Sequence, residues 1–175
     1  MADFSNRAYL FKNGKAVASN VVKGTLSPRV TVHKRAVEPH YERYGKVTYI
    51  ISVSNGTEAV KAVTLSDDLG GSVGASPLSY INGTAAIFIG GERQSIAPDA
   101  TSPALVFGGI ELPAGAVATI VYQARVSFCA GDTITNAVTL TGDGIETPLV
   151  AANTITRDKR INGGEPPFTY SVKDI

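Results

Sequence analysis

The sequence predicts an all-β protein: an immunoglobulin-like antiparallel β-sandwich with strand-forming arms at its N- and C-terminal ends. Three observations predict it. Apolar residues recur at every second position, β-branched types dominate these runs, and 18 Gly and 9 Pro residues separate them. No helical period persists over a useful length. Short, regularly spaced strands between turn signals are typical of a sandwich.

The body of the chain, residues 29–158, contains eight runs with this two-residue period. In chain order they are residues 30–36, 47–53, 60–67, 85–89, 105–107, 118–128, 133–141 and 149–156. Residues 70–77 and 90–103 are rich in Gly, Pro and Ser, and they predict long loops between strands.

Two arms flank this body. In residues 1–28, strand-like runs surround Asn13-Gly14, which is a hairpin signal. Residues 159–175 begin with a Gly-containing hinge and end in a run that alternates like a strand. Either arm can supply strands to the chain's own sheets, or it can pair with the open sheet edge of a neighbouring subunit. The candidate assembly residues are Tyr9, Leu10, Phe11, Val17, Val21 and Val22 in the N-terminal arm, and Phe168, Tyr170 and Val172 in the C-terminal arm.

Composition excludes several classes of function. Sixteen basic residues against fifteen acidic ones give a net charge of +1, which excludes a protein that binds nucleic acid through a basic excess. The single Cys129 excludes an intrachain disulfide framework, and we expect its thiol to be reduced and partly buried. No apolar run approaches the roughly 18 residues of a membrane span. Residues 1–10 have no basic stretch followed by an apolar run, so we expect no secretory signal peptide there.

The sequence offers no support for catalytic turnover, a cofactor or a metal site. The two histidines, His33 and His40, have no nearby acidic pair, and Asp67-Asp68 lacks the oxygen-rich spacing of a calcium loop. No Gly-x-Ser-x-Gly elbow or phosphate-binding loop occurs. We therefore predict that the protein is not an enzyme.

Four motifs resemble the bacterial and archaeal surface-protein repeat family known as domain of unknown function eleven. They are Val47-Thr48-Tyr49-Ile50-Ile51-Ser52-Val53-Ser54-Asn55-Gly56, Val63-Thr64-Leu65-Ser66-Asp67-Asp68-Leu69, Leu112-Pro113-Ala114-Gly115 and Thr133-Ile134-Thr135-Asn136-Ala137-Val138. The resemblance covers residues 29–157. It implies an immunoglobulin-like sandwich of the kind found on cell surfaces.

Side chains two residues apart lie on the same face of a strand, and this rule places three polar residues on apolar faces. Lys34 shares its side with Val30 and Val32, Asp67 with residues 63 and 65, and Asn136 with residues 134, 138 and 140. If those faces line the core, an amine, a carboxyl group and a carboxamide point inward. Each is costly to bury without a partner, so the combination calls for an explanation.

A self-formed isopeptide bond would explain the trio. A buried lysine has a lowered pKa and becomes a nucleophilic amine, and a buried aspartic acid can shuttle protons while Lys34 joins Asn136 and ammonia leaves. Such crosslinks are known in pilus and surface domains of Gram-positive bacteria, whose immunoglobulin-like sandwich this chain resembles. Two alternatives stay open. The three polar residues can be buried with all their hydrogen bonds satisfied, or the strand register can differ by one residue from the one assigned here, which would leave Lys34 in solvent. Lys61 and Asn153 are the runner-up partners.

These observations predict a noncatalytic structural subunit of a surface fibre or pilus-like appendage on a cell or spore. Its partners would be copies of itself, joined head to tail by a terminal strand. The alternative is a monomeric adhesin or carbohydrate-binding module that recognises a host or matrix ligand. That module would use the loops at 70–84 and 90–104, which contain the aromatic residues Tyr80 and Phe88.

Overall fold

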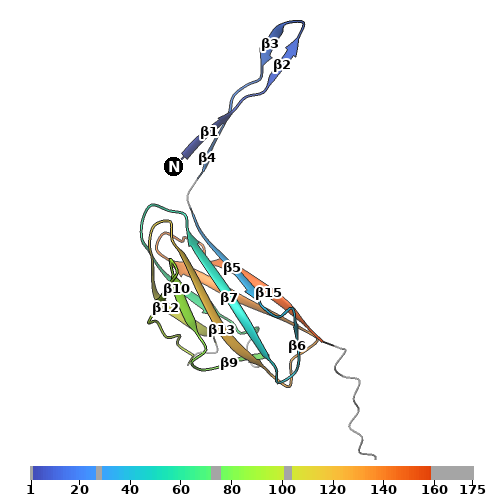
Figure 1. Cartoon of the computed structure of the whole chain (residues 1–175), viewed down its shortest axis with the longest axis vertical. Coiled ribbons are helices and arrows are strands. Elements are labelled where there is room, and N and C mark those ends of the chain that lie inside the picture. The colour runs from blue at the N-terminus through green and yellow to red at the C-terminus, as the bar shows by residue number, and fades with distance from the viewer. Residues whose placement is uncertain (1, 27–28, 72–75, 101–103, 159–175) are drawn as a thin grey trace, which may run out of the picture.

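The structure is a computed structural model that describes residues 2–26, 29–71, 76–100 and 104–158. Two β-sheets face each other and form the sandwich (Figure 1). The order of strands in the first sheet is β11 (Glu92–Gln94), β10 (Ala86–Ile89), β13 (Val117–Val126), β7 (Lys46–Asn55) and β5 (Val30–Ala36), and β9 (Leu78–Tyr80) also pairs with β13.

The second sheet follows the order β12 (Leu105–Leu112), β8 (Lys61–Asp67), β14 (Thr133–Gly142), β15 (Leu149–Arg157) and β6 (His40–Tyr41). Neighbouring strands are antiparallel throughout the sandwich, except that β15 and β6 are parallel. The prediction of an all-β immunoglobulin-like sandwich is confirmed.

The core lies between the two sheets because each long strand alternates buried and less buried side chains. In β7, Val47, Tyr49, Ile51 and Val53 are fully buried and their neighbours are not. Full burial of an aliphatic or aromatic side chain contributes about 1.5–3 kcal/mol. Inward-facing residues of the opposite sheet complete the layer; they include Val63, Leu65, Phe107, Ile110, Ile134, Val138 and Leu140.

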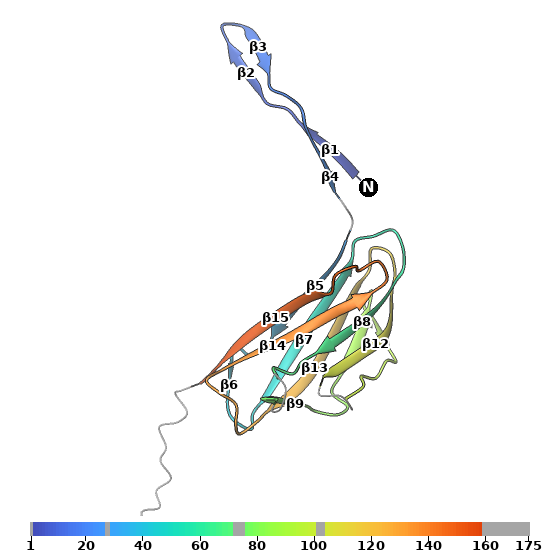
Figure 2. The same ribbon diagram turned by 180° about the vertical axis from the view of Figure 1, so that it is seen from behind.

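The described N-terminal residues form a separate two-stranded ribbon. We call residues 2–26 the N-terminal ribbon. In it, β1 (Ala2–Asn6) pairs with β4 (Val22–Leu26), and β2 (Tyr9–Lys12) pairs with β3 (Lys15–Ala18). Asn13 and Gly14 have φ values of 49° and 74°, which give the mirror-image turn that a tight hairpin requires. These strands pair with neither sheet of the sandwich, and the ribbon projects from one end of it (Figures 1 and 2).

Several predicted boundaries were wrong. The loop expected at 90–103 contains β11, a polar strand whose sequence has no apolar alternation; it pairs with β10 through a turn at Gly90 and Gly91. The strand predicted at 105–107 extends to Leu112, past a bulge between Phe107 and Ile110. The strand-like run predicted after Asn13-Gly14 is divided between β3 and β4, with residues 19–21 between them. Residues 159–175, with the predicted strand at 168–172, lie outside the described residues.

Two further observations concern the surface. Cys129 is exposed, so the expectation of a partly buried thiol was wrong; the residue lies beyond the end of β13, where the chain turns towards β14. No helix that could cross a membrane occurs in the described part of the chain.

Replacing Gly142 with alanine is expected to lower the free energy of unfolding by at least about 1–3 kcal/mol. Gly142 has a φ of 150°, and a Cβ built there would overlap the Ala62 carbonyl oxygen and lie 2.8 Å from the Val63 Cα. Both neighbours are backbone, so neither can rotate away. Urea denaturation of the variant measures the loss.

The matched control is Gly115→Ala. Gly115 also has a positive φ of 68°, but a Cβ built there meets nothing within 4 Å. This variant should lose only the cost of the left-handed backbone, about 1 kcal/mol. Equal losses in the two variants would contradict the packing argument for Gly142.

Candidate functional site

The most unusual feature of the core is an ion pair between the two sheets. Lys34 on β5 belongs to the first sheet and Asp67 on β8 to the second, and their side chains have no exposed surface. The Lys34 Nζ lies 2.6 Å from the Asp67 Oδ2 and 5.0 Å from the centre of the Tyr49 ring. A buried ion pair is stable only when further hydrogen bonds satisfy its atoms.

Those further bonds come from a tyrosine, an asparagine and the backbone. The Tyr122 hydroxyl donates to the Asp67 Oδ2 at 2.6 Å, and the Asn136 Nδ2 donates to the Tyr122 hydroxyl at 3.0 Å. The backbone N–H of Leu69 donates to the Asp67 Oδ1 at 3.1 Å. A continuous polar chain therefore runs Lys34–Asp67–Tyr122–Asn136 through the core, and we call it the buried polar chain.

Two polar atoms beside this chain have no hydrogen-bond partner. They are the Asn136 Oδ1 and the Tyr49 hydroxyl, and both are buried. Asn55, another buried polar residue, offers a contrast, because its Nδ2 donates to the carbonyl oxygens of Ala59 and Leu112. Buried polar atoms without a partner are rare in folded proteins, so this part of the core resembles a site more than a structural network.

Burial dominates the titration of the ionisable side chains here. It lowers the pKa of the Lys34 amine from its ordinary value, and the attraction of the Asp67 carboxylate opposes this shift. Burial also raises the pKa of Tyr122 well above its ordinary value, with the negative charge of Asp67 acting in the same direction. For Tyr49 burial again raises the pKa, and a polar interaction with Asn136 partly offsets the rise. Burial thus shifts the Lys34 equilibrium towards the neutral amine, and it keeps both tyrosines protonated.

The lowered pKa of Lys34 predicts a stability that depends on pH in a variant that keeps the free amine, Asn136→Ala. Below its ordinary pKa of 10.5, unfolded Lys34 binds more protons than the folded residue. The free energy of unfolding should therefore rise with pH in that window, by at most about 1.4 kcal/mol per pH unit. Above about pH 10 it should fall, because Tyr49 and Tyr122 ionise only in the unfolded chain.

Denaturant titrations between pH 7 and pH 11 measure this profile. The control is the double variant Lys34→Met with Asn136→Ala, which lacks the amine and should lose the rising limb. A rising limb of equal slope in both proteins would contradict the assignment to Lys34.

The runner-up residues lie elsewhere. Lys61 is half-buried at the start of β8, opposite Leu112 of β12. Asn153 is also half-buried; it is the register partner of Asn136, and its Oδ1 accepts a hydrogen bond from the backbone of Ala36 at 3.1 Å. Neither belongs to the buried polar chain.

Sequence reasoning missed Tyr49 and Tyr122. Both stand at inward positions of long alternating strands, where a tyrosine needs a polar partner for its hydroxyl. The need of a buried tyrosine hydroxyl for a polar partner was the signal that could have identified both residues. The candidate assembly residues of the N-terminal ribbon are exposed: Tyr9, Leu10, Phe11, Val17, Val21 and Val22.

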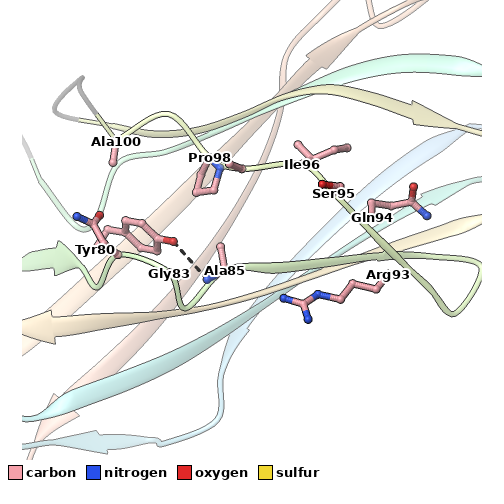
Figure 3. Close-up of a pocket in the computed structure, with 11 residues that line it drawn as sticks. Tyr80, Gly83, Ala85, Arg93, Gln94, Ser95, Ile96, Pro98 and Ala100 are labelled. Atoms are coloured by element: carbon pink, nitrogen blue, oxygen red, sulfur yellow. Dashed lines mark hydrogen bonds between the residues drawn. The ribbon is translucent and has the colours of Figure 1, made fainter.

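A second candidate site is a cavity of about 590 Å³ on the side of the sandwich. It lies between the segment around Tyr80 and Ala85 and the segment from Arg93 to Ala100 (Figure 3). The Tyr80 hydroxyl accepts a hydrogen bond from the Ala85 N–H at 3.2 Å, which fixes the ring against the wall. No group of three or more His, Cys, Asp or Glu side chains that could hold a metal occurs in residues 2–26, 29–71, 76–100 and 104–158.

Comparison with known proteins gives a likeness of fold. No protein-family model matches the sequence, and no curated protein matches it. Among solved structures, the major pilin SpaD from Corynebacterium diphtheriae is similar with a TM-score of 0.55 and 11% identity, over 71% of this chain and 34% of that chain. The pilus backbone protein RrgB from Streptococcus pneumoniae has a TM-score of 0.51 and 13% identity, over 66% of this chain and 52% of that chain.

A third similar structure is the RrgA Jo.In complex. Its TM-score is 0.57 at 13% identity, and the match covers 87% of this chain and 92% of that chain. The present chain thus spans about half the length of RrgB and about a third of SpaD. At these identities, the shared feature is the immunoglobulin-like sandwich.

Proposed function

We propose that this chain is a noncatalytic structural subunit of a surface fibre or pilus-like appendage. It would assemble by donating its N-terminal β-structure to another copy, and an isopeptide bond between Lys34 and Asn136 would close its sandwich. The buried polar chain is the observation that carries this proposal. The fold that this chain shares with the pilins SpaD and RrgB supports a place on a cell surface. A spore surface remains part of the proposal.

The buried polar chain supplies the groups that the crosslinking reaction needs. Lys34 transfers a proton to the Asp67 carboxylate, to which its Nζ is already hydrogen-bonded. The neutral amine attacks the Asn136 Cγ, and a new C–N bond forms. Asp67 gives its proton to the Nδ2 as the Cγ–Nδ2 bond breaks and ammonia leaves. Asp67 then takes the second proton of the attacking nitrogen, which leaves a neutral amide N–H. Each chain turns over once, so the protein is not an enzyme in the ordinary sense.

The two unpartnered atoms also fit this reaction. Negative charge develops on the Asn136 Oδ1 as the amine attacks, and an oxyanion needs a donor. The Tyr49 hydroxyl is buried without a hydrogen-bond partner, and the Tyr49 ring stacks on the ring of Tyr122, whose hydroxyl binds the Asn136 Nδ2. Its raised pKa keeps it protonated, so it can donate to the developing charge. We assign Tyr49 as this donor.

The N-terminal ribbon supports assembly through this end of the chain. A two-stranded ribbon is marginally stable in water unless something covers it. The ribbon exposes large apolar side chains, and each of its strands has one edge that no described strand occupies. Main-chain hydrogen bonds at such an edge are the means by which β-strand addition joins proteins.

Intact-mass spectrometry and negative-stain electron microscopy of the purified full chain test the proposal together. A mass lighter than the sequence by one ammonia molecule, and unbranched filaments, are expected. A protein at its unmodified mass would rule out the crosslink. Uniform monomers over a wide range of concentration would rule out self-assembly.

A monomeric binding module is the second candidate function, and the 590 Å³ cavity favours it. The cavity lies where the loops at 70–84 and 90–104 were predicted to bind a ligand. Its lining combines the Tyr80 ring with polar groups of Asn82, Arg93 and Gln94, which suits a polar ligand such as a sugar. Saturable glycan binding by a monomeric protein, lost in Arg93→Ala, would favour this function over assembly.

A further inference from the structure

A stacked pair of exposed aromatic rings lies at one end of the sandwich. The Tyr44 and Phe128 side chains are 63% and 57% exposed, yet their ring centres lie 5.8 Å apart at an interplanar angle of 26°. The Arg43 guanidinium lies 5.3 Å from the centre of the Phe128 ring. We call these three residues the end patch. Single exposed aromatics are ordinary, but a preformed stack with a cation over it resembles a contact surface.

The backbone at Tyr44 is held in a costly conformation. Its φ of 63° lies in the left-handed region, which costs a residue with a bulky side chain about 1–2 kcal/mol. Three hydrogen bonds hold it there: the Tyr44 N–H donates to the Val126 carbonyl at 3.1 Å, the Gly45 N–H to Glu42 at 3.0 Å, and the Arg125 Nη1 to the Tyr44 carbonyl at 3.4 Å. Strain of this kind is concentrated at functional sites.

The end patch and the N-terminal ribbon lie at opposite ends of the sandwich. Val30, the first residue of β5 and close after the ribbon in sequence, pairs with Asn55 at the end of β7. Tyr44 precedes the opposite end of β7, where Lys46 pairs with Arg125 shortly before Phe128. The ten residues of β7 separate the two ends by about 30 Å. Figures 1 and 2 show the ribbon beyond one end of the sandwich and β6 at the other.

The ribbon carries rings that match the end patch. Tyr9 and Phe11 alternate onto one face of β2, where their ring centres lie 6.4 Å apart, and they are 56% and 75% exposed. Leu10 and its partner Val17 make the opposite face apolar as well. Both faces of this hairpin therefore expose apolar side chains that a partner could bury. Aromatic pairs contribute about 0.5–1.5 kcal/mol beyond their buried area.

Charge also divides between the two parts of the chain. The ribbon, residues 2–26, has four basic residues and one acidic residue, a net charge of +3. The sandwich, residues 29–158, has nine basic and twelve acidic residues, a net charge of −3. The two charges nearly cancel in the whole chain, whose net charge is +1, so composition alone does not reveal their separation. Opposite net charges of the ribbon and the sandwich as a whole speed the encounter of two copies.

From these features, we propose that the end patch of one copy is the acceptor for the Tyr9 and Phe11 face of the ribbon of another copy. The inference rests on the ribbon-mediated assembly of the proposed function and names the receiving surface. Because donor and acceptor lie at opposite ends, the contact is heterologous and propagates head to tail. The occupant of the end patch is therefore a second copy of this chain.

Two blocked variants of the full-length protein test this proposal by sedimentation velocity. The ribbon variant is Tyr9→Ser with Phe11→Ser. The patch variant is Tyr44→Gly with Phe128→Ser, and glycine suits the positive φ at that position. Each variant alone should associate at least about tenfold more weakly than the wild type. An equimolar mixture should form one-to-one dimers and no longer species, because only one intact ribbon and one intact patch remain to pair.

The matched control is Val60→Ser with Val150→Ser, which removes two exposed apolar residues, 59% and 64% exposed, outside both surfaces. This variant should assemble like the wild type, and raising NaCl from about 0.05 M to about 0.5 M should weaken wild-type assembly at least about tenfold. Circular dichroism checks that all variants are folded.

The outcomes separate the two proposals. A patch variant that assembles like the wild type, beside a ribbon variant that does not, would overturn the end patch as acceptor and keep ribbon-mediated assembly. A ribbon variant that assembles like the wild type, or a wild type that stays monomeric, would overturn ribbon-mediated assembly itself. A mixture without dimers would also overturn the pairing of ribbon with end patch.

Discussion

Replacing Lys34 with methionine is expected to lower the free energy of unfolding by at least about 3–5 kcal/mol. The substitution shortens the side chain by one atom and leaves the Asp67 carboxylate, which has no exposed surface, without its cation. Only the Tyr122 hydroxyl and the Leu69 N–H would then stabilise that charge. Urea denaturation at pH 7 measures this loss in the Asn136→Ala background, where Lys34 keeps its free amine. In a crosslinked chain Lys34 is an uncharged amide, so the substitution removes the crosslink instead of an ion pair.

The double variant Lys34→Met with Asp67→Asn is the control. Removing the carboxylate's charge as well should restore part of the stability, because a neutral amide costs far less to bury than an unpaired carboxylate. The two changes are in contact, so their effects should not add. A double variant less stable than Lys34→Met alone would contradict the account of the buried pair.

The second large effect is expected for Asn136→Ala. Without the carboxamide no bond to Lys34 can form, so the protein should have the unmodified mass that its sequence gives. By analogy with a disulfide that closes a loop of about 100 residues, the free energy of unfolding should fall by about 4–5 kcal/mol. Intact-mass measurement and chemical denaturation of the same preparation give both values.

Asn153→Ala separates this reaction from its nearest alternative. Asn153 is the register partner of Asn136 on the neighbouring strand, and its carboxamide contacts the backbone of β5. The Asn153→Ala protein should remain lighter than its sequence by one ammonia molecule. If it instead has the unmodified mass while Asn136→Ala stays light, the crosslink joins Asn153 and the assignment to Asn136 is wrong.

The sequence predicted the sandwich because the strands are half-buried, so apolar and polar residues alternate along them. The same parity directed attention to Lys34, Asp67 and Asn136. It could not identify Tyr49 or Tyr122 as their neighbours, because parity says which face a side chain occupies and nothing about which residue stands across the core. The 2.6 Å contact between β5 and β8 depends on how the sheets are stacked.

Other features were missed for local reasons. β11 is three residues long and polar, so its strand character comes from pairing with β10 and not from its own composition. The exposure of Cys129 and the left-handed backbone at Tyr44 depend on turns whose shape tertiary contacts determine. Overall neutrality hid the opposite charges of the ribbon and the sandwich, which appear only after the fold divides the chain.

The position of Lys34 within β5 has a mechanical consequence. Tension applied through the N-terminal ribbon enters the sandwich at Val30, and it can peel β5 away from β7 only as far as the first covalent anchor. With the Lys34–Asn136 bond formed, residues 30–33 alone can extend, which is about 14 Å of chain. Beyond that length the load passes through covalent bonds into β14. In a fibre of such subunits, tension from the ribbon would then reach the centre of each sandwich before the rest of β5 could detach from β7.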